Sequence, residues 1–77
     1  MLTATGTRSH GRRIVTLGWT GAIGTNVDIY RNNALLVNTL NDGAYTDTIN
    51  GGGHGTFTYR VCQQGTQTCS NNVTVNF

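Results

Sequence analysis

The sequence predicts an all-β protein, a sandwich of about seven antiparallel strands arranged in two sheets. The first observation is a period of two in several strand-sized runs, as in Val15, Leu17 and Trp19, where apolar residues alternate with polar ones. The second is a set of Gly- and Asn-rich breaks between these runs. The third is composition, because Thr and Asn are abundant while Glu and Lys are absent. Two sheets that each expose one apolar face are stable when those faces pack together.

The first half of the chain divides into four expected strands. LTATG, residues 2–6, is predicted to form a short edge strand, and TRSHGR is predicted to be the loop that follows. In the next strand, 13–20, Trp19 shares the core face with Val15 and Leu17. In 25–31, Asp28 and Tyr30 alternate with Val27 and Ile29 and are expected to face solvent. Asn32-Asn33 then predicts a tight turn into the fourth strand, 34–40, since Asn tolerates positive φ.

The second half predicts three more strands, 44–49, 56–63 and 68–77. Tyr45 and Ile49 share a face in the first of these, with Asp47 between them. Phe57, Tyr59 and Val61 alternate with polar residues in the next. The Gly-rich segment 50–53 is expected to connect these two strands as a flexible loop.

Length and charge restrict the possible roles. A chain of 77 residues is predicted to form one domain, 1–77, with a small core. A net charge of +2 is too low to predict nucleic acid as a partner. The sequence has no run of 18 apolar residues, so no membrane insertion is expected. It also lacks a signal peptide, so an exported protein would carry this chain as part of a longer precursor.

Two cysteines, Cys62 and Cys69, bracket the segment CQQGTQTC. A disulfide is the favoured interpretation, since a small domain gains about 2–3 kcal/mol from such a link. Two buried thiols or a metal pair are the alternatives. Zinc normally takes four ligands, and His10 and His54 would have to complete the set. The disulfide predicts a secreted protein in an oxidising, extracellular compartment, and no metal or cofactor is expected.

The segments LGWTG, NVDIYRN, DGAYTD and GTFTYRVC…TCSNNVTVNF together resemble a fibronectin type III-like domain. They are most similar to the small cysteine-containing kind found at the C-terminal side of secreted bacterial proteases and other exported hydrolases. The resemblance implies an immunoglobulin-like sandwich in which Trp19 is the core tryptophan of the second strand. It aligns Phe57 with the family's corner tyrosine, whose hydroxyl Phe57 lacks. Tyr59 takes that role if the alignment shifts by two residues.

Several residues are candidates for binding. Arg8, Arg12 and Arg13, with His10, form the only basic cluster, which suits an anionic polymer or the acidic face of a neighbouring domain. Tyr30 is a candidate because it is expected to be exposed. His54, within GGGHGT, is a further candidate, although this segment lacks the Lys-Ser/Thr ending of a phosphate-binding loop. For each of them the alternative is an ordinary solvated side chain.

Catalysis is not expected. Ser9 and His10 are residue types of a hydrolase, but consecutive side chains diverge, and a triad also needs a carboxylate and an oxyanion site. The resemblance therefore implies a non-catalytic accessory module that acts as a spacer or binds substrate. Its expected partners are a neighbouring catalytic domain in the same precursor and an insoluble polymer or protein substrate. A free-standing extracellular adhesion or protein-binding domain is the alternative function, and a small hydrolase is the third.

Overall fold

The computed structural model describes residues 1–51, 54–66 and 68–77. Its strands are β1 (Leu2–Ser9), β2 (Arg12–Trp19), β3 (Asn26–Arg31), β4 (Ala34–Leu40), β5 (Ala44–Asn50), β6 (Thr56–Gln63) and β7 (Val73–Asn76). Residues 52 and 53, in the expected Gly-rich connection, lie outside the described part of the chain.

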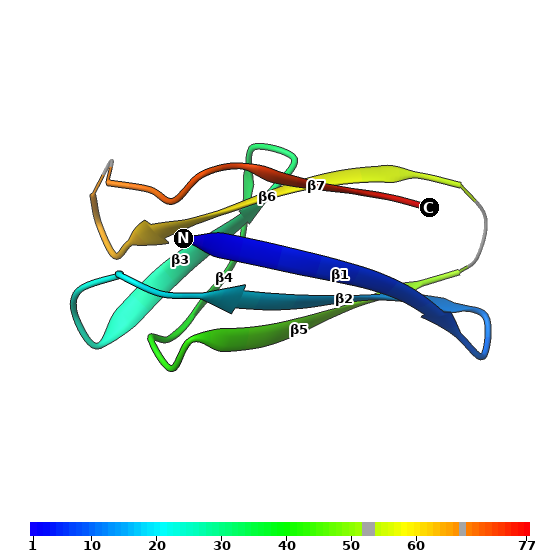
Figure 1. Ribbon diagram of the computed structural model, residues 1–77, viewed down its shortest axis with the longest axis horizontal. Coiled ribbons are helices and arrows are strands. Elements are labelled where there is room, and N and C mark those ends of the chain that lie inside the picture. The colour runs from blue at the N-terminus through cyan, green and yellow to red at the C-terminus, as the bar shows by residue number, and fades with distance from the viewer. Residues whose placement is uncertain (52–53, 67) are drawn as a thin grey trace.

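The strands form two antiparallel sheets that face each other (Figure 1). One sheet has the order β1-β2-β5, and the other has the order β4-β3-β6-β7. Every pairing within them is antiparallel. The predicted fold class, a sandwich of seven antiparallel strands in two sheets, is confirmed.

A tight turn sets the register of the β3–β4 hairpin. Asn32 (φ 52°) and Asn33 (φ 67°) both occupy the left-handed region, which is the conformation of a two-residue type I′ turn. Asn32 also accepts a hydrogen bond from the Thr58 backbone N–H through its side-chain oxygen, at 2.9 Å. The turn predicted from the Asn pair is therefore present between β3 and β4.

The predicted loop after residue 6 is wrong. β1 continues to Ser9, which pairs with Arg12, and the chain reverses over His10 (φ 51°) and Gly11 (φ 75°). The polar residues in this stretch gave no apolar alternation, and their strand conformation follows from pairing with β2. Arg8 and Arg12 consequently lie on strands and not in the predicted loop, and Arg13 lies on a strand as predicted.

The last strand is shorter than predicted, since 68–77 contributes only Val73–Asn76 to β7. Before β7 the chain forms an isolated bridge at Cys69 and then leaves the sheet. Asn71 bonds the backbone of Leu2 at this point, accepting from its N–H at 2.9 Å and donating to its carbonyl at 3.1 Å. The amide side chain thus replaces a neighbouring strand at the edge of β1.

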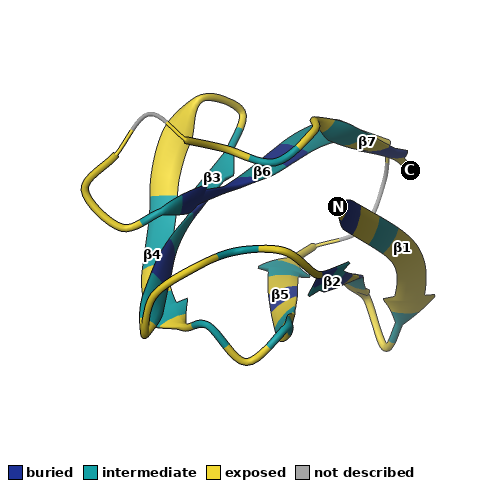
Figure 2. Cartoon of the chain, turned by 60° about the vertical axis from the view of Figure 1, so that its left-hand side comes forward, coloured by how far each residue is buried: buried dark blue, intermediate teal, exposed yellow. Residues whose placement is uncertain are grey.

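The core lies between the sheets, where the alternating apolar residues meet (Figure 2). The buried apolar side chains are Leu2, Val15, Leu17, Trp19, Val27, Ile29, Tyr59, Val61 and Val75. Trp19 is 6% exposed, as its predicted core position requires, and its indole Nε1 donates to Asn41 Oδ1 at 2.9 Å. Val27 and Ile29 are fully buried and confirm the predicted inner face of β3.

Candidate functional site

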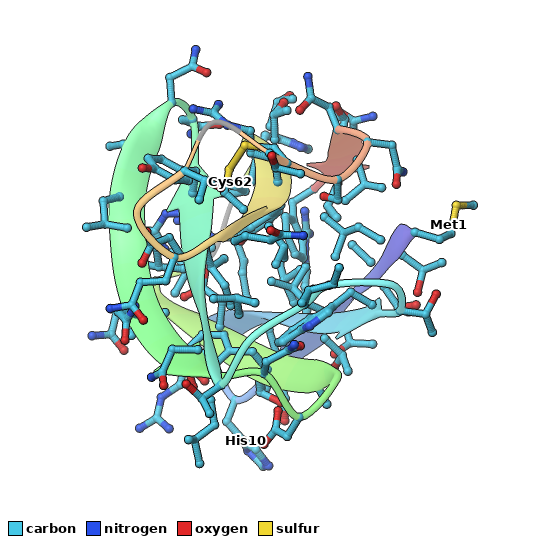
Figure 3. The ribbon with its side chains drawn as sticks, turned by 90° about the vertical axis from the view of Figure 1, so that its left-hand side faces the viewer. Met1, His10 and Cys62 are labelled. Carbon is cyan, nitrogen blue, oxygen red and sulfur yellow. A yellow bond between two sulfur atoms is a disulfide. The ribbon has the colours of Figure 1, made fainter. Side chains whose placement is uncertain are left out.

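The predicted disulfide is present between Cys62 and Cys69 (Figure 3). The two residues lie opposite each other on antiparallel segments. Backbone bonds flank them, from Gln63 N to Thr68 O at 2.9 Å and from Ser70 N to Val61 O at 2.7 Å. This makes the cysteines a non-hydrogen-bonded pair, the position at which two antiparallel strands approach most closely. Neither cysteine is a free thiol.

The arginines of the predicted basic cluster divide between two faces of the sheet. Arg8 and Arg13 are register partners, and Arg13 is also opposite Ile49 of β5. Their guanidinium groups lie over aromatic rings at the end of the sandwich, Arg8 at 5.8 Å from the Phe77 centroid and Arg13 at 5.1 Å from that of Phe57. Such cation–π contacts cover the open end of the core.

Arg12 has the opposite orientation, because neighbouring residues on a strand point to opposite faces. It is exposed on the outer side, between Ser9 and Asn50. The structure therefore does not bring Arg8, Arg12 and Arg13 together as one anion-binding cluster.

His54 is exposed near the same end of the sandwich as Arg13. Its ring Nδ1 lies 3.3 Å from the Phe77 carbonyl, and its own carbonyl accepts from Arg13 at 3.3 Å. These contacts connect the segment before β6 with Phe77 and with Arg13 of β2. They give His54 a structural role beside any binding role.

Among the described residues, no hydrogen bond or ion pair assembles a hydrolase triad. His10 and Ser9 belong to the β1–β2 turn region, and no hydrogen bond or ion pair joins either to a carboxylate there. Asp28 accepts from Asn38 at 2.8 Å, and Asp42 accepts from the backbone of Ala44 at 3.3 Å. The described residues also contain no group of three or more His, Cys, Asp or Glu suited to a metal.

The third carboxylate, Asp47, is buried inside the sandwich at 5% exposure. Its Oδ2 accepts from the Tyr59 hydroxyl at 2.7 Å and from Arg31 Nη1 at 2.8 Å. Tyr59 is fully buried and Arg31 is one-third exposed on its side chain, so the ion pair is open to solvent on one side only. This cluster was not predicted from the sequence. Its signal was the period of two, which assigns Asp47 and Arg31 to core-facing positions.

Phe57 and Tyr59, the two positions considered for a corner tyrosine, differ in their surroundings. Phe57 is half-buried and packs edge-on against Phe77, with ring centroids 5.9 Å apart. The buried hydroxyl belongs to Tyr59, two residues later, and it bonds a side-chain carboxylate of β5.

Tyr30 lies on the outer face of the four-stranded sheet, as predicted, but it is half-buried. Its ring is covered by Arg60, whose guanidinium carbon is 4.4 Å from the ring centroid, and Arg60 donates to Asn33 at 2.9 Å. Leu35 is opposite Tyr30 on β4 and is 58% exposed. Tyr30, Arg60 and Leu35 therefore form one continuous patch beside the free edge of β4.

A small pocket of about 150 Å³ lies at the disulfide end of the sandwich. Trp19, Ala22, Val61 and Cys69 are among the residues that line it. Among the residues that line it, none has a titratable side chain.

The fold and the disulfide define the chain as a disulfide-closed β-sandwich domain. The disulfide is compatible with an oxidising extracellular compartment. Helices long and apolar enough to cross a membrane are absent from the described residues. Comparison with protein-family models, curated proteins and solved structures gives no match.

Proposed function

We propose that this chain is a non-catalytic accessory module of a secreted hydrolase, in which it holds a catalytic domain at a set distance and faces the substrate. The observation that carries this proposal is the path of the chain through the sandwich. β1 begins at the disulfide end, and β7 finishes at the end covered by Arg8 and Arg13 (Figure 1). Polypeptide attached before β1 and after β7 would leave from opposite ends of a body 35 Å long.

The interior of the sandwich supports a mechanical role. It is filled by apolar side chains and by the Arg31–Asp47–Tyr59 cluster, in which each polar group has a partner. A closely packed core resists deformation, which suits a spacer, and the disulfide ties the end of β6 to the segment before β7. The resemblance of the sequence to modules of exported proteases makes a hydrolase the expected parent, most plainly a bacterial protease.

The test has two parts. The isolated chain should give no turnover of ester or peptide substrates above a blank, and turnover abolished by His10→Ala would overturn the proposal. In the full-length protein, deletion of residues 2–76 should leave turnover of a small soluble substrate unchanged and reduce turnover of an insoluble one. Equal loss on both substrates would contradict a spacer role.

A free-standing adhesion or protein-binding domain is the second candidate. The patch of Tyr30, Arg60 and Leu35 favours it, because Tyr and Arg are common at the centres of protein interfaces. The adjacent edge of β4 has backbone groups available to an added strand. Capture of a protein ligand that is lost on Arg60→Ala would select this function over the spacer.

A further inference from the structure

The outer face of the three-stranded sheet carries a regular array of threonines. Residues directly opposite each other in antiparallel strands point to the same side, so the registers of β1, β2 and β5 define rows across this face. The rows are Thr3–Gly18–Ala44, Thr5–Thr16–Thr46 and Thr7–Ile14–Thr48. We call these three rows the threonine face.

The threonines of this face are all exposed. Thr3 donates to the Gly18 carbonyl at 3.3 Å. The hydroxyls of the other threonines in the array make no hydrogen bond to any residue that the structure describes, and these are Thr5, Thr7, Thr16, Thr46 and Thr48. Their donors and acceptors are therefore available to a ligand.

The other sheet provides a contrast within the same molecule. There Thr58 and Thr74 bond each other across β6 and β7 at 3.2 Å, and Thr56 donates to Asn76 at 3.1 Å. Threonine occurs on both outer faces because it is a good strand former. Only the threonine face keeps its central hydroxyls unpaired within the described chain.

Charge is absent from the three rows. The nearest charged side chain of β2 on this side is Arg12, one row beyond Thr7. Asp47 belongs to β5, but it points into the core, between Thr46 and Thr48. An ionic ligand would therefore gain no charge partner on this face.

The array spreads over three neighbouring strands. Alternate residues on a strand lie about 6.6 Å apart and neighbouring strands about 4.8 Å apart, so hydroxyls and methyls repeat over the face at near-regular intervals. The pocket lined by Trp19 and Cys69 lies elsewhere, at the disulfide end. This geometry suits a long or solid ligand better than a single small molecule.

We propose that the threonine face binds a neutral, insoluble polysaccharide. Each threonine hydroxyl donates one hydrogen bond and accepts others, as sugar hydroxyls do, so water is replaced without leaving a polar group unpaired. The threonine methyls lie beside these hydroxyls and contact the C–H surface of sugar rings. A protein partner is less favoured, because the rows contain no aromatic or Arg anchor.

This inference rests on the proposed accessory function and names the class of solid to which the module attaches, whichever hydrolase it accompanies. It is tested by adsorption of the 77-residue chain to microcrystalline cellulose and to chitin, measured as depletion from solution. The test variant is the middle row, Thr5→Val, Thr16→Val and Thr46→Val together. Valine keeps the branched shape and strand preference while it removes the hydroxyl.

The matched control makes the same chemical change on the other sheet, Thr56→Val, Thr58→Val and Thr74→Val together. We expect the wild type and this control to adsorb to at least one of the two polysaccharides. The middle-row variant should adsorb at least about tenfold more weakly, since three hydrogen-bonding hydroxyls are lost together. Adsorption should not change at high salt, because the face is uncharged.

Four results would overturn the inference. The first two are no adsorption of the wild type to either polysaccharide and equal adsorption of the two triple variants. The third is loss of adsorption at high salt. The fourth comes from parallel assays on ice and on proteins such as casein or collagen, if the chain is retained only on one of these. Thermal unfolding of both variants verifies that they are folded. Failure here is distinct from failure of the accessory function, which is decided by the turnover assays on the isolated chain.

Discussion

Among single residues, the interior cluster of Arg31, Asp47 and Tyr59 shows most clearly what the sequence could and could not predict. Period two identified Val27 and Ile29 as core residues, and the same count assigns Arg31 to their face. An arginine at a core-facing position indicates a buried ion pair only when its acidic partner is also known. The partner is 16 residues away on a strand of the other sheet, and the sequence contains no signal for which strands face each other across the core.

The buried phenol of Tyr59 should make the free energy of unfolding fall at alkaline pH. Burial, and then the hydrogen bond and charge of Asp47, raise the pKa of the Tyr59 phenol because each disfavours the phenolate. An acid with a higher pKa in the folded state loses its proton more readily after unfolding. Its contribution to the free energy of unfolding is therefore complete below about pH 10 and is lost above it, by at most about 1.4 kcal/mol per pH unit.

The measurement is urea unfolding at a series of pH values from neutral to alkaline. Tyr59→Phe is the comparison, and it should be less stable by about 1–3 kcal/mol at neutral pH because buried Asp47 loses a donor. The difference between the two proteins should shrink as the pH rises above about 10. No lysine is present to titrate in the same range, and the variant keeps the other two tyrosines. A difference that stays constant with pH would disprove the role of this phenol.

At the scale of elements, strands with one apolar face were predictable and polar strand ends were not. β3 and β6 were predicted to within one residue, because their apolar residues alternate and turn residues flank them. The second half of β1 was missed, since Thr7, Arg8 and Ser9 contain no apolar residue. Their conformation is imposed by pairing with β2, a tertiary contact that local sequence does not encode.

The β6–β7 hairpin should depend on its disulfide. Closure of this short ring contributes about 2–3 kcal/mol in the chain-entropy model, and the ring ties the end of β6 to the segment before β7. Reduction should therefore lower the free energy of unfolding by about that amount. The measurement is urea unfolding with and without a reductant.

A double variant, Cys62→Val with Cys69→Val, is the control for this experiment. Valine pairs are favourable at directly opposite strand positions, and this variant has no bond to reduce. Its unfolding curve should be the same in both solutions. If the reductant shifted the curve of the variant as much as that of the wild type, the effect would not come from the disulfide.

At the scale of the whole molecule, the two sheets separate residues that are neighbours in the sequence and unite others that are distant. The basic cluster illustrates this, because Arg12 and Arg13 are adjacent in sequence yet lie on opposite faces of β2. Arg13 instead contacts Phe57 of β6, and Arg8 contacts Phe77, which directly follows β7. The threonine face was equally invisible in the sequence, since its rows exist only through the registers of three strands.

The distance between the sheets depends on Gly6, where β1 passes close to Val75 of β7. A Cβ at Gly6 would lie 2.5 Å from Val75 Cγ1 and 3.0 Å from Phe77 Cζ. Both neighbours belong to the core or pack against it, so they cannot move freely. Gly6→Ala should therefore push β1 from β7 and destabilise the sandwich by about 1–3 kcal/mol, measured by urea unfolding.

Gly18→Ala is the matched control, on the same sheet but facing outward. Its added Cβ would meet nothing closer than Thr3 Oγ1 at 3.5 Å, an ordinary contact. This variant should unfold within about 0.5 kcal/mol of the wild type. Because both substitutions reduce the entropy of the unfolded chain equally, the difference between them isolates the steric cost between the sheets. Equal stability of the two variants would mean that β1 and β7 can separate without loss, and that the sandwich is not closed on this side.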